Sequence, residues 1–121
     1  MTACDLFIQN LLRYRPIKLA HDESIDTWGK DVDFLILCAD IGRSVADSFD
    51  VFSIEERQKI FKIIEVAMNS DNEKLSTAVA TGLLEAMYIK AEKTPSLLMQ
   101  INPMLGSKTK NYLDSWINWQ T

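Results

Sequence analysis

The amino-acid sequence predicts an all-α fold of five to six helices, and three observations carry this prediction. No segment alternates apolar and polar residues between turn signals, as a half-buried strand would. Apolar residues recur at helical spacing in residues 34–49 and again in residues 60–68. Two strong helix-start signals are present, a capping box at residues 53–56 and a Thr94-Pro95 pair. We therefore expect helical hairpins that stack as a compact bundle or as a short α-solenoid, HEAT-like in shape.

The first 33 residues are expected to form one helix and one loop. Residues 2–14 carry a partly periodic apolar stripe and predict a first helix, which Pro16 would end. Residues 15–31 show no helical period and contain both Pro16 and Gly29. Such a stretch predicts an irregular loop, and long loops in compact domains are often functional.

This predicted loop is acidic and contains one tryptophan. Asp22, Glu23 and Asp26 lie close to Trp28 in the sequence. An aromatic side chain among carboxylates is suited to anchor a basic partner. The alternative is that Trp28 packs against the core and fixes the loop in place.

A second helix is predicted over residues 34–48, capped by Asp31 or Asp33. Its outer face carries charged side chains at i, i+3 and i+7 spacing: Asp40, Arg43 and Asp47. These residues are either a surface that recognises a partner or a solvated face with weak internal pairs. Helix-surface pairs are worth only ~0.2–0.5 kcal/mol, so stability does not require them.

A central helix is predicted around residues 75–89, which are apolar on nearly every side. Gly82 costs about 1 kcal/mol relative to alanine in a helix, so we expect a close helix contact there, and another at Gly42. Glu85 is the one charged side chain of this stretch. A carboxylate there needs a polar partner, and a structural role is expected for it.

The C-terminal segment predicts two further helices. Residues 95–101 follow Thr94, and a break at residues 102–106 precedes a last helix capped by Ser107. This last helix has an aromatic-rich stripe that is expected to pack in the core, comprising Tyr112, Leu113, Trp116, Ile117 and Trp119.

The composition predicts a single globular domain, residues 1–121, with residues 34–119 as its helical core. The net charge is −4, but residues 22–73 hold 13 acidic and 5 basic side chains. This excess of negative charge disfavours nucleic acid and favours a basic partner. The two cysteines lie far apart, and no signal peptide or membrane-spanning run is recognised, so we expect a cytoplasmic protein.

Motifs for catalysis and for cofactors are not found. The single histidine, His21, has no second histidine or cysteine near it in the sequence, so no metal site is predicted. No glycine-rich phosphate loop and no nucleophile elbow is present, and no cofactor is expected. A small enzyme acting through Glu85 or His21 stays open as a minor alternative.

Several features of residues 34–116 resemble a family of small helical bacterial proteins, largely uncharacterised, whose genes often lie beside polymorphic or contact-dependent toxin genes. The resemblance rests on Asp40 with Gly42, residues 69–73, residues 82–85, and residues 103–106 followed by Trp116. Members of that family look like immunity proteins, which neutralise a toxin by binding it.

The resemblance implies an immunity protein that binds a cognate toxin domain, such as a nuclease. We further expect no enzymatic activity and a monomer or weak dimer. A nuclease needs a cationic groove for its substrate, and the acidic segment complements such a groove. The expected toxin-binding residues are Asp22, Glu23, Asp26, Trp28, Asp40, Asp47 and Asp50. The alternative is a helical adaptor that binds a partner protein through an apolar groove near Tyr112, Trp116 and Trp119.

Overall fold

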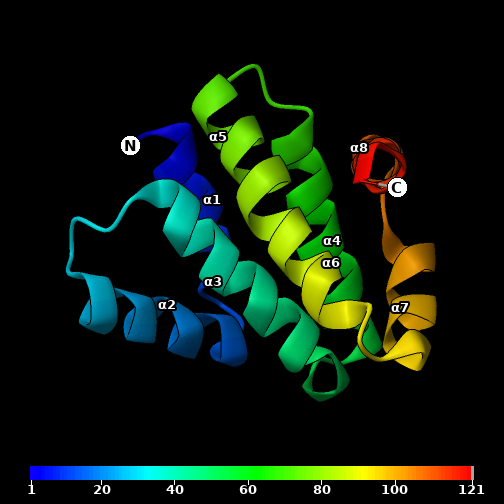
Figure 1. The fold of residues 1–121 in the computed structure, drawn as a ribbon. Helices are drawn as coiled ribbons and strands as arrows, with labels where there is room; N and C mark the ends of the chain where they lie inside the picture. The colour runs from blue at the N-terminus through cyan, green and yellow to red at the C-terminus, as the bar shows by residue number, and fades with distance from the viewer. Residues whose placement is uncertain (121) are drawn as a thin grey trace.

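The computed structural model describes residues 1–120, and all the regular structure in that range is helical (Figure 1). The elements are α1 (Ala3–Leu11), α2 (Arg15–Trp28), α3 (Phe34–Asp47), η1 (Phe49–Val51), α4 (Ile54–Met68), α5 (Glu73–Thr77), η2 (Ala78–Leu84), α6 (Glu85–Ala91), α7 (Pro95–Ile101), η3 (Asn102–Met104) and α8 (Ser107–Gln120). The all-α prediction is confirmed. With α5, η2 and α6 counted as one helix, the described chain has seven helices, one more than the upper number expected. Thr121, the last residue of the predicted domain, lies outside the described residues.

The prediction of an irregular loop over residues 15–31 is wrong, because Arg15–Trp28 forms helix α2. Pro16 lies in the first turn, where a proline breaks no helical hydrogen bond. The buried face contains Ile17 and Ser24, which are 0% and 3% exposed, so a polar residue interrupts the apolar period. Gly29, at φ 95°, ends the helix in a conformation that favours glycine. In this region, only the short connection between α2 and α3, residues 29–33, is irregular.

The central helix, residues 73–91, comprises α5, η2 and α6 and runs without a break through the bundle (Figure 1). It packs against α3 on one side and against α4 and α8 on others, so its predicted central position is confirmed. Its middle seven residues, η2, are π-helical. A π-helix widens the turn by one residue and is rare outside single turns.

The two predicted glycine contacts meet at one place, where α3 crosses the π-helical segment. A Cβ on Gly42 would lie 2.1 Å from the carbonyl oxygen of Leu83. A Cβ on Gly82 would lie 2.9 Å from the carbonyl oxygen of Leu35. Both obstacles are backbone atoms, so the two helices are closer together here than side chains would allow.

Helix α8 receives its N-terminal cap from α4, and not from Ser107 as the sequence predicts. The Glu65 carboxylate accepts hydrogen bonds from the backbone N–H groups of Lys108 and Thr109, at 2.9 and 3.0 Å. It also accepts the Thr109 hydroxyl at 2.7 Å. Burial raises the pKa of Glu65, but these hydrogen bonds outweigh it and hold the pKa below its ordinary value. A Cβ on Gly106 would lie 2.3 Å from this carboxyl group, so a larger residue there would have to displace the Glu65 side chain from its cap.

The aromatic stripe of α8 is only partly in the core. Leu113 is buried, and the rings of Tyr88 and Trp116 meet edge to face with centroids 5.7 Å apart. The Tyr112 hydroxyl donates a hydrogen bond to Glu85, which supplies the partner expected for that carboxylate. Trp119 is 85% exposed, so its predicted core position is wrong. None of the helices formed by residues 1–120 is long and apolar enough to cross a membrane.

Candidate functional site

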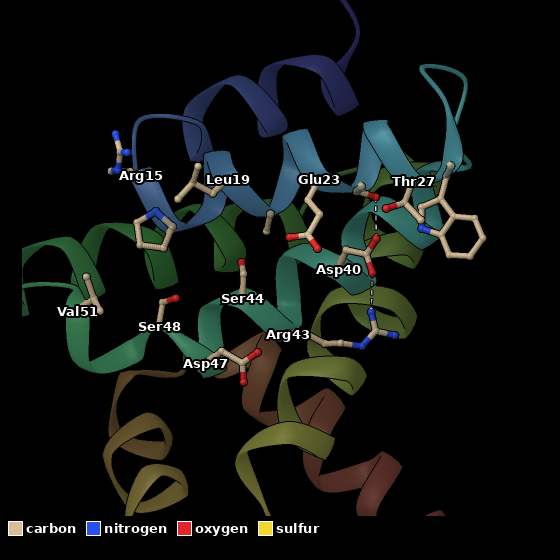
Figure 2. Close-up of a pocket in the computed structure, with 14 residues that line it drawn as sticks. Arg15, Leu19, Glu23, Thr27, Asp40, Arg43, Ser44, Asp47, Ser48 and Val51 are labelled. Carbon is tan, nitrogen blue, oxygen red and sulfur yellow. Dashed lines mark hydrogen bonds and ion pairs between the residues drawn. The ribbon is translucent and has the colours of Figure 1, made fainter.

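A groove runs between α2 and α3 and encloses a volume of about 740 Å³. We call it the α2–α3 groove, and Figure 2 shows it in close-up. Its lining comes from α2, α3 and the short η1 segment. The lining residues are Arg15, Pro16, Leu19, Ala20, Glu23, Ser24, Thr27, Trp28, Asp40, Arg43, Ser44, Asp47, Ser48 and Val51. Four of the seven residues predicted to bind a partner therefore meet in one place: Glu23, Trp28, Asp40 and Asp47.

Asp40 joins the two walls of this groove. One oxygen of its carboxylate accepts the Ser24 hydroxyl of α2 at 2.7 Å. The other oxygen accepts a hydrogen bond from the Arg43 guanidinium at 2.8 Å, one turn further along α3 (Figure 2). Ser24 is only 3% exposed, so its hydroxyl depends on this acceptor. Asp40 is therefore a positioning residue that holds α2 on α3.

Glu23 and Asp47 are the carboxylates that this groove leaves available. Glu23 is exposed, and it has no ion pair or side-chain hydrogen bond within residues 1–120. In Figure 2 it extends from α2 toward α3, near Asp40 and Ser44. Asp47 pairs with Lys90 of α6 at 3.2 Å, but both side chains are well exposed. Such a pair is worth only ~0–1 kcal/mol, so an incoming cation can replace Lys90 at little cost.

Large apolar side chains border the same groove and are open to solvent. Trp28 is 59% exposed, Leu19 is 55% exposed and Val51 is 72% exposed. The alternative in which Trp28 packs into the core is therefore wrong. Exposed apolar side chains beside the unpaired Glu23 and the weakly paired Asp47 give a surface suited to both the charged and the apolar parts of another protein.

The other three predicted residues, Asp22, Asp26 and Asp50, do not line the groove. Asp22 bonds Lys18 at 2.9 Å and His21 at 3.0 Å, and these hydrogen bonds lower its pKa. Asp26 and Asp50 are exposed, on α2 and η1. They extend the acidic surface around the groove and take no part in its lining.

Sequence reasoning missed Arg15, Leu19 and Val51 as members of the groove. Arg15, Leu19 and Glu23 are four residues apart, so they share one face of α2. That spacing is visible in the sequence, but it carries information only once residues 15–28 are recognised as a helix.

Glu85 borders a second, separate hollow of about 480 Å³ between α3 and α6. The other charged side chains that line it are cations: Arg43, Lys90 and Lys93. The Glu85 carboxylate already accepts the Tyr112 hydroxyl, and burial together with this bond raises the pKa of Tyr112. These contacts are consistent with the structural role expected for Glu85. Within residues 1–120, no group of three or more His, Cys, Asp or Glu side chains is placed to hold a metal ion.

Comparisons with protein-family models, with curated proteins and with solved structures found no match to this chain.

Proposed function

We propose that this chain is an immunity protein that binds and neutralises a cognate bacterial toxin domain through the acidic surface centred on the α2–α3 groove. One observation carries the proposal. Glu23 and Asp47, which are distant in the sequence, lie on one groove with the exposed indole of Trp28. An inhibitor of a nuclease is expected to present such a surface, because the nuclease groove that it covers is cationic.

The charge distribution supports the same proposal. Residues 22–73, which hold 13 acidic and 5 basic side chains, include the second half of α2 and all of α3. Negative potential on one face attracts a basic domain and raises the rate of productive encounter. The same potential repels nucleic acid, so the surface would compete with a nuclease substrate without binding that substrate itself.

Co-expression with the candidate toxin tests the proposal. The C-terminal domain encoded by the gene upstream of this one would be expressed alone and together with this chain, and cell growth and co-purification would be measured. We expect the domain alone to stop growth and the pair to grow and to co-purify. A toxic domain that the wild-type chain neither binds nor neutralises would overturn the proposal.

Charge-reversal variants locate the binding surface. Glu23→Lys combined with Asp47→Lys should abolish protection, because both available carboxylates of the groove are reversed. The matched control is Asp71→Lys combined with Glu92→Lys, which makes the same change in net charge at exposed positions outside the groove. Equal protection by both double variants would remove the groove from the binding surface.

An adaptor function is the second candidate, and one observation favours it. An apolar hollow of about 320 Å³ lies between α1 and α4, with Leu6 and Val66 at its surface, 53% and 59% exposed. This is not the apolar site expected from the sequence, since Tyr112 and Trp116 are partly buried against the core. Replacing Leu6 and Val66 by serine separates the two candidates. Loss of co-purification of the partner in this variant would favour the adaptor, and retained co-purification would favour binding at the α2–α3 groove.

A further inference from the structure

The α2–α3 groove is the size of a small-ligand pocket and not of a whole protein interface. Its volume of about 740 Å³ falls within the ~300–1,000 Å³ range of pockets that hold a few chemical groups. A partner domain would therefore place only a short segment in the groove itself.

The charged side chains that line the groove are of both signs. Glu23, Asp40 and Asp47 are negative, whereas Arg15 and Arg43 are positive. Asp40 and Arg43 bond each other, so they attract an incoming charge less than Glu23 and Asp47 do. Arg15 has no ion pair within residues 1–120 and would repel a second cation. This arrangement favours one cation in the middle of a segment over a run of several.

The apolar lining of the groove favours apolar side chains on either side of that cation in the partner segment. The exposed side chains of Leu19, Trp28 and Val51 border the groove, so apolar neighbours of the cation would lose water-exposed surface against them. Trp28 also offers a ring face on which a guanidinium can stack. Arginine suits the site better than lysine because its planar fork can bond two carboxylate oxygens at once.

From these observations we infer that the α2–α3 groove takes a short segment of the partner protein in which a single arginine, directed to Glu23, is flanked by apolar side chains. The inference rests on the proposed function, because it states which part of the toxin domain this surface recognises. Binding leaves the Ser24–Asp40 link intact, and Asp47 adds its negative charge from the same lining.

The chain carries its own reporters for a test in solution. It has three tryptophans, and their indole N–H signals in a ¹⁵N–¹H correlation spectrum report on three places. Trp28 borders the groove, Trp116 packs against Tyr88, and Trp119 is exposed near the end of α8. The Trp28→Phe variant assigns the groove signal by its disappearance.

The probe is the acetylated and amidated peptide Ala-Leu-Arg-Leu-Ala, compared with peptides that have glutamine or glutamate in the central position. We expect the arginine peptide to shift the Trp28 signal progressively and to leave the Trp119 signal in place. The glutamine peptide should cause a smaller shift and the glutamate peptide none. Glu23→Lys with Asp47→Lys should abolish the response, and the Asp71→Lys, Glu92→Lys control should retain it.

Three results would overturn the inference: no response at Trp28, an equal response to the glutamate peptide, or an equal arginine response at Trp119. The outcome is independent of the co-expression experiment. A specific peptide response without toxin neutralisation would keep the inference about the groove and remove the proposed function. Neutralisation without a peptide response would do the opposite.

Discussion

Replacing Glu65 should destabilise the protein through α8, a helix 43 residues away in sequence. Glu65→Ala removes the acceptor of two backbone N–H groups and of the Thr109 hydroxyl, and Thr109 is only 1% exposed. Loss of a helix cap costs about 0.5–2 kcal/mol, and a buried donor without a partner costs about 1–3 kcal/mol. We therefore expect the free energy of unfolding to fall by about 2–3 kcal/mol in Glu65→Ala.

Glu65→Gln separates the charge of this cap from its hydrogen bonds. An amide oxygen still accepts hydrogen bonds, but it lacks the negative charge that favours a helix N-terminus, so we expect a loss of about 1 kcal/mol at neutral pH. The folded state holds the pKa of Glu65 below its ordinary value of 4.5. Its ionised form therefore stabilises the fold above that pH, and this contribution is lost as the pH falls through the folded-state pKa.

Urea denaturation followed by circular dichroism measures both effects. The difference between the wild type and Glu65→Gln should be largest at neutral pH and should shrink below pH 4.5. Glu55→Gln is the matched control, because Glu55 lies on the same helix and pairs with Lys59 at the surface, with 76% of its side chain exposed. A Glu65→Gln variant that is as stable as this control, or whose stability deficit grows as the pH falls, would contradict this role of Glu65.

Three further predictions test other contacts. Gly42→Ala should lower the free energy of unfolding by about 1–3 kcal/mol, because its Cβ would lie 2.1 Å from the carbonyl oxygen of Leu83. An unobstructed helical glycine gains stability from the same change, so a stabilised variant in a urea titration would contradict this contact. Ser24→Ala should speed amide hydrogen exchange in α2 more than in α3, since it removes the hydrogen bond to Asp40; unchanged exchange in α2 would argue against the link. Tyr112→Phe should leave the phenolate absorbance of the folded protein unchanged just above pH 10, because burial and hydrogen bonding raise the pKa of Tyr112 above its ordinary 10.0, and a loss of absorbance would contradict that.

Most of the fold could be predicted because the relevant signals are local. The capping box of Ser53 and Glu56 forms as the sequence indicates, since its two residues lie three apart. Helix α2 could not be recognised from its apolar spacing, because its buried face contains Ser24. The Ser24 hydroxyl finds its hydrogen-bond acceptor in Asp40 of α3. The Glu65 cap and the π-helical segment depend on contacts between distant parts of the chain, and no local pattern reports such contacts.

The sequence indicated which residues belong to the candidate site, but not where they come together. The acidic segment and Trp28 stand out in the sequence, and four of the seven proposed residues line one groove. The groove itself requires α2 to be helical and to lie against α3, so its apolar members could not be chosen. The sequence also could not show which carboxylates are structural. Asp40 accepts a hydrogen bond from the buried Ser24 and Asp47 does not, and this difference is seen only in the structure.

The link between Ser24 and Asp40 has a consequence for how this surface can diversify. Asp40 bonds α2 to α3, so a substitution there changes the contact between the groove walls along with the charge of the groove. Glu23 and Asp47 contribute charge to the groove but do not hold its walls together, because neither side chain bonds α2 to α3. New partner preferences can therefore be acquired by substitution at these two positions while the groove keeps its shape. A designer who wishes to retarget the protein would vary Glu23, Asp47 and Trp28 and keep Asp40.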